Sequence, residues 1–296
     1  MPLVTIQGRS AGIHALIIGV SDYTYLPGDD DPVEDGAKLG MKKLKTPALG
    51  AFRFLQWLQK ADAAASDAKV RLLHPLASCD VILAASPEER AIPGLSDWVE
   101  DATTDKVVKR IREWRDRVAE NRDNVALLYF SGHGIQRNKE DAVLMLQDFA
   151  QSKDSMLEHA ISFFEIFSGM APSDDYPNMG MTQLYFVDAC RNLPEQIKNF
   201  ARLNTRPVFD NYLGGRDDRI APVFFAAVND SKAFAEIGRG SYFNRALLAA
   251  LERGAENSRD CSGVKCWPVS VFTLTTAISN EFENFDIKQN FVPAGQ

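Results

Sequence analysis

VALLYFSGHG at Val125–Gly134 and LYFVDACR at Leu184–Arg191 are the two stretches of the sequence that decide the fold. Each begins with a short, almost wholly apolar run, which is typical of a parallel strand buried on both faces of a sheet. Each run then places one reactive side chain, His133 or Cys190, at the carboxyl end of its strand, the edge where open α/β sheets place their sites. Thiol-based nucleophilic catalysis requires this pair, a thiolate that attacks and an imidazole that moves protons.

The composition is that of a soluble globular protein. The chain has 296 residues, 45% of them hydrophobic, which is enough for one substantial core. Its 40 acidic and 33 basic residues give a net charge of −7, and the absence of a basic run interleaved with aromatic residues argues against a nucleic-acid partner. Segment 1–12 lacks the pattern of a signal peptide, and no run reaches the roughly 18 apolar residues of a membrane span. We therefore expect a cytoplasmic protein without a membrane partner.

The four cysteines indicate neither a disulfide framework nor a metal site. Cys261 and Cys266 are separated by four residues in a loop, and a zinc site would need two further ligands nearby. Cys79 is expected to pack as a small hydrophobic residue. A reducing compartment is the simpler assumption, and Cys190 is the candidate nucleophile.

Strands and helices alternate along the chain, which is the order expected of an α/β protein with a parallel sheet. His14–Val20 is a first buried strand, and Pro32 opens a helix that includes Met41 and Leu44. Further strands are expected at 70–73, 81–83, 142–146 and 222–228. Further helices are expected at 48–68, from Thr103 or Thr104 to 118, from a capping box at Ser162 to Phe167, around 243–251 and around 271–282. The segments 87–100 and 193–221 are expected to be loops, the second long and exposed.

The ordered set of motifs resembles the caspase family in the broad sense, including metacaspases and paracaspases. The matching segments are the strand at 15–20, SGHG at 131–134, DACR at 188–191, the strand at 223–228 and GSYF at 240–243, and together they cover about residues 13–285. The resemblance implies an α/β fold, a three-layer αβα sandwich with a mostly parallel central sheet, in one catalytic domain at 1–296. Asp188 is a departure from the executioner caspases, which carry Gln there, whereas metacaspases and paracaspases carry Asp.

The resemblance assigns the chemistry. Cys190 is expected to attack the scissile carbonyl as a thiolate, and His133 to move protons to and from the reacting groups. The backbone N–H groups of Gly134 and Cys190 are expected to form the oxyanion hole, because this family uses those two donors. No cofactor and no metal are expected.

The expected substrate is a protein or peptide with a basic residue before the cut. Asp188 lies two residues before Cys190 on one strand, so both side chains should point to the same face. Asp35 matches the position from which metacaspase-like enzymes contribute a second pocket carboxylate, and two carboxylates favour Arg or Lys. A third acidic member, Asp230 or Glu236, is less clear because Lys232 lies between them. The full set of substrate-binding candidates is Asp35, Asp188, Asp230, Glu236, Ser241 and Tyr242.

Simpler explanations exist for several of these residues. Asp188 alone is compatible with a turn cap, and Asp35 with a first-turn acid stabilised by the helix dipole. Gly28–Asp31 offers oxygen ligands for calcium, which some metacaspases require, but it lacks the spacing of an EF-hand loop and a solvated turn is favoured. His14, His74 and His159 are expected to be structural or exposed, and Phe163, Phe164 and Phe167 to belong to the core.

Two other functions are compatible with parts of the sequence. A catalytically silent scaffold of the same fold is the main alternative, but such relatives usually lose Cys or His, and both are present. A flavodoxin-like nucleotide or phosphate binder needs a glycine-rich loop, whereas Val20–Asp31 is acidic.

Regulation is suggested by the loop at 193–221, which contains Arg202, Arg206, Arg216 and Arg219. An enzyme that cuts after basic residues is expected to be able to process itself there, as mature caspases often are. An activating partner is expected, and relatives of this family often act in programmed death or defence. The ending at 293–296 is compatible with a catalytic fragment of a longer protein.

Overall fold

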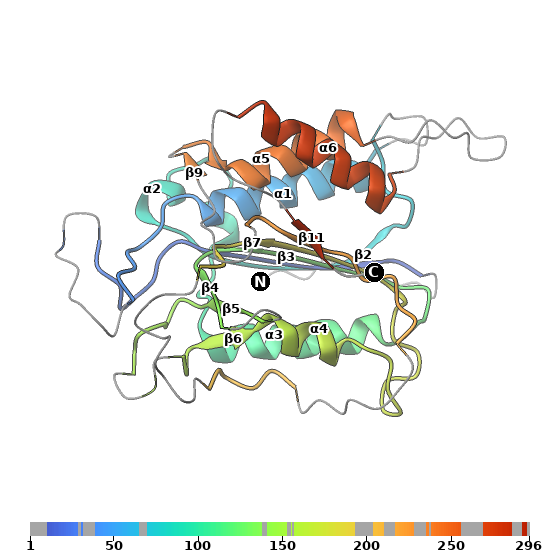
Figure 1. Cartoon of the computed structure of the whole chain (residues 1–296), viewed down its shortest axis with the longest axis horizontal. Coiled ribbons are helices and arrows are strands. Elements are labelled where there is room, and N and C mark those ends of the chain that lie inside the picture. The colour runs from blue at the N-terminus through green and yellow to red at the C-terminus, as the bar shows by residue number, and fades with distance from the viewer. Residues whose placement is uncertain are drawn as a thin grey trace.

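The computed structural model of the chain has a large sheet at its centre, seen edge-on in Figure 1. It describes residues 11–28, 31, 39–64, 70–137, 141–152, 155, 157–192, 204–209, 217–227, 235–236, 238–255, 269–285 and 292–294. Within these residues the sheet has six strands in the order β11-β8-β7-β3-β1-β2. Their bounds are β1 (Ile13–Val20), β2 (Leu76–Ala84), β3 (Val125–Ser131), β7 (Thr182–Asp188), β8 (Val223–Phe225) and β11 (Val292–Ala294). The strands from β2 to β8 are parallel, and β11 runs antiparallel to β8.

The two motif-bearing strands lie side by side in this sheet. Every residue of β3 is buried, as the apolar run predicted, because β1 and β7 pair with its two edges and helices cover both faces. In the β3–β7 pair, Phe130 lies beside Val187 and Ser131 beside Asp188. The two strands therefore end at the same level, and the chain leaves the sheet at neighbouring points.

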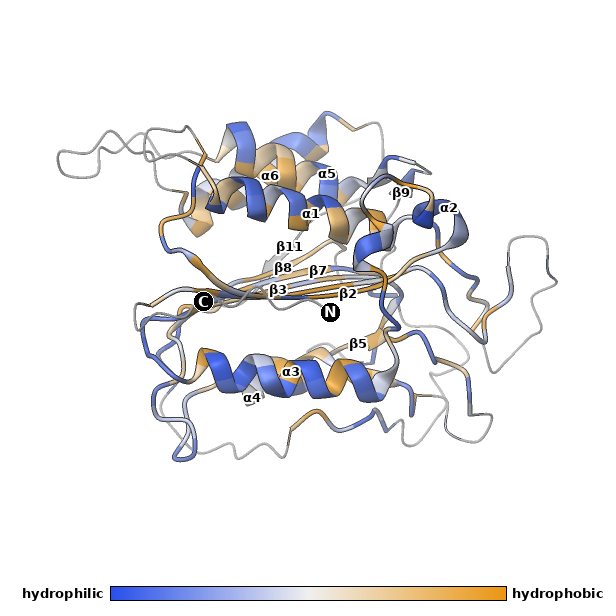
Figure 2. Cartoon of the chain, turned by 180° about the vertical axis from the view of Figure 1, so that it is seen from behind, coloured by the Kyte–Doolittle hydropathy of each residue, from blue (hydrophilic) through white to orange (hydrophobic). Residues whose placement is uncertain are grey.

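Helices cover both faces of the sheet, as Figures 1 and 2 show from opposite sides. On one face lie α1 (Pro47–Asp62), α5 (Tyr242–Ala249) and α6 (Val271–Glu283), and on the other lie α3 (Thr104–Val118) and α4 (Phe163–Gly169). The expected three-layer α/β architecture is thus confirmed. None of the helices in the described part of the chain is long and apolar enough to cross a membrane.

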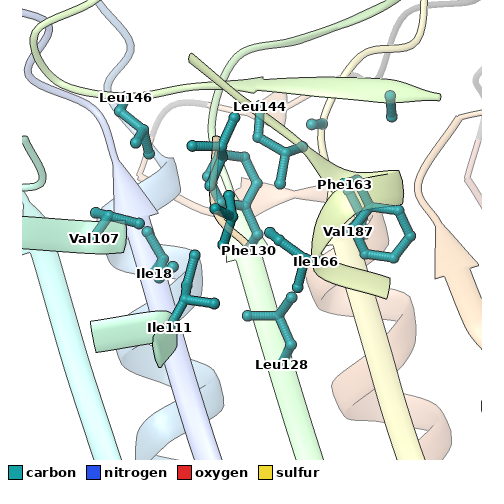
Figure 3. Packing of buried hydrophobic residues seen from close by; sticks show 14 of the residues in the cluster. Ile18, Val107, Ile111, Leu128, Phe130, Leu144, Leu146, Phe163, Ile166 and Val187 are labelled. Carbon is teal, nitrogen blue, oxygen red and sulfur yellow. The ribbon is translucent and has the colours of Figure 1, made fainter. Parts of the chain in front are cut away.

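The layer on the α3 and α4 side has an apolar core that is continuous with the sheet. Figure 3 shows Ile18, Leu128 and Val187, from three neighbouring strands, gathered with Ile111 of α3 and Ile166 of α4. A second, small sheet of β4 (Gly134–Gln136), β5 (Ala142–Met145) and β6 (Ala160–Ser162) belongs to the same layer. Because β4 begins three residues after β3 ends, this small sheet holds the chain that follows the histidine motif.

Several predicted elements have different bounds in the structure. Helix α1 ends at Asp62, and the expected strand at 70–73 is wrong, because the pairing strand β2 begins at Leu76 and Leu73 is 75% exposed. The helix expected from Pro32 is wrong where it is described: the Lys43 and Leu44 amides donate to carbonyls of the preceding loop rather than to a helix. Residues 32–38 of that prediction lie outside the described residues.

The N-terminal caps of two helices differ from the prediction. The expected loop at 87–100 contains α2 (Pro87–Arg90) and η1 (Ser96–Trp98), and a capping box between Ser86 and Glu89 starts α2. Thr103 precedes α3 as expected, but its side chain makes no cap hydrogen bond; the Asp148 carboxylate accepts from the Thr104 N–H instead.

The loop predicted at 193–221 is not wholly exposed. Within it, the described segment 204–209 is docked on the α3 and α4 layer: the Arg206 N–H donates to the Ala160 carbonyl at 2.9 Å, and the Val208 N–H donates to Glu165 Oε2 at 3.2 Å. Val208 is fully buried. Glu165 is therefore occupied by this docked segment, and it does not complete the capping box predicted at Ser162.

The C-terminal third of the fold contains elements that the sequence did not indicate. These are the short pair β9 (Ala235–Glu236) and β10 (Gly240–Ser241) and the edge strand β11, while the π-helical turn η3 (Ala250–Gly254) extends the helix expected around 243–251 beyond its predicted end. Each strand here has only two or three residues, too few for a periodic pattern. One core assignment is also wrong, since Phe164 is 41% exposed while Phe163 beside it is buried.

Candidate active site

The two reactive side chains are placed by the aligned ends of β3 and β7. The Gly132 N–H donates to the Asp188 carbonyl at 3.2 Å, which continues the contact between the two chains beyond the last paired residues. His133 and Cys190 each follow two residues after their strands end. The prediction that both lie at the carboxyl edge of one parallel sheet is consistent with this register.

The chain segments beyond the strands also touch. A Cβ atom built on Gly134 would lie 2.8 Å from the Cys190 carbonyl oxygen and 2.9 Å from the Ala189 Cβ atom, so a side chain at 134 does not fit. Two residues further on, the Gln136 N–H donates to the Asn192 carbonyl at 3.0 Å. The absence of a side chain at Gly134 therefore allows the histidine and cysteine segments to approach closely.

The imidazole of His133 is oriented by a backbone group. Its Nε2 atom lies 2.7 Å from the Lys42 carbonyl oxygen. A carbonyl can only accept, so Nε2 carries a proton, and in the neutral ring the lone pair is on Nδ1. Burial lowers the pKa of His133 to about 4, although the Lys42 carbonyl opposes that change. At neutral pH the ring is therefore uncharged and able to accept a proton through Nδ1.

Tyr23 is a second group that contacts His133, and the sequence reasoning missed it. The Tyr23 hydroxyl accepts the His133 backbone N–H at 2.7 Å, and the two rings lie 4.9 Å apart between centroids. Burial raises the pKa of Tyr23 well above its usual range; the hydrogen bond from the His133 N–H opposes the rise, and the proximity of Cys190 adds a little to it. A signal did exist, because Tyr23 lies three residues beyond β1, at the same edge of the sheet.

Asp188 is buried, and one of its oxygens collects hydroxyl donors from three other residues. Its Oδ2 atom accepts from Tyr129 and Ser131 of β3, each at 3.2 Å, and from the Ser241 hydroxyl. Burial raises the pKa of Asp188 to about 6, while the three hydrogen bonds oppose the rise. The structure thus brings Asp188 and Ser241 together, and it adds Tyr129 and Ser131, which the sequence did not single out.

The remaining substrate-binding candidates have other neighbours. Ser241 also caps α5, where it accepts the Asn244 N–H at 2.9 Å. Tyr242 is half-buried, with its ring 5.0 Å from that of Phe285. Glu236 pairs with Arg245 at 3.1 Å, so its charge is partly balanced within the chain. Asp35 and Asp230 lie outside the described residues.

Several groups for which the sequence predicted no catalytic role, among them two histidines and Cys79, are buried or contact other groups of the chain. His14 is buried against the Ser78 hydroxyl at 2.8 Å, and His159 contacts Asp148 at 3.0 Å. Cys79 is buried, and desolvation raises the pKa of its thiol to about 12. At the ends of the acidic stretch 28–31, the Asp31 carboxylate accepts the Gly28 N–H, and residues 29 and 30 lie outside the described residues. No group of three or more potential metal-ligating side chains occurs within the described ranges.

Comparisons with known proteins place this geometry in a family. A model of the caspase domain matches residues 13–290. The fold is similar to the crystal structure of caspase-1 from Spodoptera frugiperda, with a TM-score of 0.55 and 12% sequence identity over 98% of this chain and 92% of that chain. Among curated proteins, none matches the chain. The resemblance inferred from the motifs is confirmed at this level: the chain belongs to the caspase-domain family of cysteine peptidases.

Proposed function

We propose that the chain is a cysteine endopeptidase that cleaves peptide bonds after Arg or Lys. The observation that carries the proposal is the contact between the two motif segments at Gly134 and Cys190, where a side chain at 134 would overlap the Cys190 carbonyl. This contact and the aligned ends of β3 and β7 support the proposal, because they bring the backbone segments that carry His133 and Cys190 to one edge of the sheet.

In the proposed reaction, Nδ1 of His133 takes the thiol proton as the Cys190 sulfur attacks the scissile carbonyl carbon. The tetrahedral intermediate collapses when His133 returns that proton to the leaving amine, which leaves a thioester on Cys190. Water, deprotonated by the same imidazole, then hydrolyses the thioester and regenerates the thiol. The Lys42 carbonyl supports these roles because it keeps the second ring proton on Nε2.

The proposed oxyanion hole is supported by the direction of one peptide group. The His133 carbonyl accepts the Met145 N–H of β5 at 3.0 Å. In a planar trans peptide the carbonyl and the following N–H point in opposite directions, so the Gly134 N–H points away from β5. The Gln136 N–H has the same direction and reaches Asn192, just after the nucleophile. The Gly134 N–H is therefore directed toward the side on which the 190–192 segment runs.

The proposed preference for a basic residue rests on Asp188. Asp188 is 4% exposed, and three hydroxyl groups fix the position of Oδ2. A guanidinium or ammonium group that reaches this carboxylate would be largely removed from water, where a charge-assisted hydrogen bond is strong. Asp35 and Asp230 are proposed as further carboxylates of the same pocket, as the family resemblance suggests. The metacaspase-like or paracaspase-like subgroup is part of the same proposal.

An activity-based probe tests the proposal. We expect an arginyl chloromethyl ketone to alkylate the wild-type chain once, at Cys190, and an aspartyl ketone to react far more slowly. Cys79 serves as an internal control, because its buried thiol has a raised pKa and should stay unmodified in the same digest. If a folded chain shows no labelling of Cys190 by either ketone, a catalytically silent scaffold becomes the better explanation.

A further inference from the structure

The Tyr23 side chain occupies a place that a backbone hydrogen bond normally fills. His133 and Met145 face each other at the first rung between the β4 and β5 segments. In a regular antiparallel rung the His133 N–H would donate to the Met145 carbonyl. Here the Tyr23 hydroxyl lies between them: it accepts the His133 N–H at 2.7 Å and donates to the Met145 carbonyl at 3.4 Å.

The hydroxyl therefore holds one of the two peptide groups that flank the His133 Cα atom. Tyr23 binds the N–H of the peptide before it, and the Met145 N–H binds the carbonyl of the peptide after it. These two hydrogen bonds fix the direction from which the imidazole leaves the backbone. The second peptide group also contains the Gly134 N–H, so a shift of this rung would move both the base and the proposed oxyanion donor.

The residues around Tyr23 hold its ring in place and leave room for its hydroxyl. Its side chain is fully buried, and its ring lies against the imidazole at 4.9 Å with a 49° tilt. A Cβ atom on Gly132 would lie 2.9 Å from the Tyr23 hydroxyl oxygen, so the hydroxyl reaches the backbone only because position 132 has no side chain. The SGHG motif thus contains one glycine that admits Tyr23 and another that admits Cys190.

We propose that Tyr23 is a positioning residue for His133, acting through the hydroxyl that bridges the His133 N–H and the Met145 carbonyl. The proposal rests on the proposed function, since it assigns Tyr23 a part in the same cysteine peptidase site. It does not make Tyr23 a proton donor to substrate. Tyr23 contributes by keeping Nδ1 of the imidazole and the Gly134 N–H in the arrangement that the reaction needs.

The direct test is Tyr23→Phe, which removes the hydroxyl and keeps the ring against the imidazole. Because small misplacements of reacting groups slow catalysis strongly, we expect kcat on an arginyl peptide to fall by roughly 10- to 100-fold. KM should stay within about twofold, because Tyr23 packs in the apolar cluster of the α3 and α4 layer, whereas Tyr129, which binds Asp188, packs in the cluster on the α1 side, so uniform substrate binding is retained. The rate of Cys190 alkylation by the arginyl ketone should fall in parallel with kcat.

Tyr185→Phe is the matched control. Tyr185 is also fully buried, and its hydroxyl donates to Gln183 Oε1 at 2.6 Å, on β7 but away from the histidine segment. Both variants lose one buried hydroxyl, so both should lose stability, but only Tyr23→Phe should lose kcat. Equal kcat values for Tyr23→Phe and the wild-type chain, or equal losses in both variants, would overturn the positioning role.

Gly132→Ala provides a second test that keeps Tyr23 in place. The added methyl group would displace the hydroxyl, so we expect the same loss of kcat with KM retained, and this readout is available even if Tyr23→Phe does not fold. A wild-type level of kcat in Gly132→Ala counts against the proposal. Failure of the proposed function has a different signature. In that case the wild-type chain itself shows neither cleavage nor labelling, and so behaves like the Cys190→Ala variant.

Discussion

The Lys42 carbonyl oxygen lies 2.7 Å from Nε2 of His133, and this contact decides which nitrogen of the ring holds the proton. With burial lowering the pKa of the imidazole to about 4, the resting ring is neutral over the physiological range. Acid inactivation near pH 6 would therefore have to come from another group. Asp188, whose pKa burial raises to about 6, is that group in the proposed site.

The first prediction concerns the pH dependence of cleavage. Above pH 6 Asp188 is ionised and attracts a basic side chain; below it the neutral acid does not. We expect kcat/KM for an arginyl peptide to decline below about pH 6, because this ratio reports groups of the free enzyme. In the bound state the substrate cation favours the carboxylate, so the acid limb of kcat should lie at lower pH. A kcat/KM that is constant down to pH 5 would remove Asp188 from substrate binding.

The second prediction links Asp188 to stability. Its pKa rises from 3.8 to about 6 on folding, so between these values the folded chain binds more protons at this residue than the unfolded chain does. The contribution of Asp188 to the free energy of unfolding is therefore full below pH 4 and falls as pH rises through 6, by roughly 3 kcal/mol. We expect Asp188→Asn to lack this slope in urea unfolding and to be at least as stable as the wild-type chain at pH 7.5, while losing arginyl cleavage.

Asp80→Asn is the contrasting control for that measurement. Asp80 is equally buried, but it is paired with Arg110 at 3.1 Å and with Arg117. Burial raises the pKa of Asp80 as well, but the two arginines oppose that rise, and Asp188 has no such partners among its hydrogen bonds to the described residues. Asp80→Asn takes this carboxylate from Arg117, while Arg110 keeps Glu100 at 3.5 Å, so the variant should lose about 3 kcal/mol at pH 7.5 because a charge stays largely buried without its partner. If Asp188→Asn loses as much stability as Asp80→Asn, Asp188 is a structural anchor for its three hydroxyl donors rather than a carboxylate retained for binding.

The third prediction concerns Gly134. In Gly134→Ala the new methyl group meets the Cys190 carbonyl at 2.8 Å, which must separate the two motif segments. Since losing one oxyanion donor typically slows catalysis about 100-fold or more, we expect a decrease in kcat of that size. Gly12→Ala is the matched control, because a Cβ atom there also overlaps a neighbour, at 2.6 Å from the Ala77 Cβ atom, but position 12 lies just before β1 begins, at the end of the strand opposite the site. It should lose stability without losing kcat. Full activity in Gly134→Ala would show that the contact with Cys190 does not matter for catalysis.

The sequence predicted the part of the fold that buried parallel strands and long amphipathic helices form. The strands at Val125–Ser131 and Thr182–Asp188 have the short apolar runs typical of buried parallel strands, and the helix with Ile111 and Trp114 on one face has helical spacing over fifteen residues. Short elements such as the edge strand Val292–Ala294 could not be predicted, because two or three residues are too few to show a hydrophobic periodicity. The docking of segment 204–209 could not be predicted, because the residues that accept its hydrogen bonds, Ala160 and Glu165, are distant in sequence.

The site was predictable to the extent that reactive side chains followed recognisable strands. His133 and Cys190 could be identified as candidates from their residue types and their positions after apolar runs. The contact with Lys42 could not be predicted, because it uses a backbone carbonyl, which every residue has. Tyr23 acts on a peptide group of His133, a role without a residue-type signature. The three hydroxyl donors of Asp188 lie 59, 57 and 53 residues away along the chain. The register of β3 and β7 brings Tyr129 and Ser131 to it, and the start of α5 brings Ser241.

The last prediction concerns self-processing in the loop after Cys190. Two of its four arginines are held by the fold: Arg206 pairs with Asp105 at 2.8 Å while its N–H is bonded to Ala160, and Arg219 is 7% exposed. A substrate segment must enter the active site in extended form, so cleavage after either arginine would first require its backbone to leave this place in the fold, even though the Arg206 side chain is 48% exposed. Arg202 and Arg216, which lie outside the described residues, are the remaining candidates.

We therefore expect the wild-type chain, when incubated, to yield fragments that Cys190→Ala does not, with new termini that intact-mass measurement places after Arg202 or Arg216. Arg206→Gln is the matched control and should leave the fragments unchanged, because its partner Asp105 is 83% exposed and the substitution perturbs only a surface pair. A new terminus after Arg206 in the folded chain would mean that the 204–209 segment leaves its place on the α3 and α4 layer before cleavage. That result would contradict the docked arrangement as the state that is processed, since the backbone bond to Ala160 and the bond to Glu165 would both have to open first.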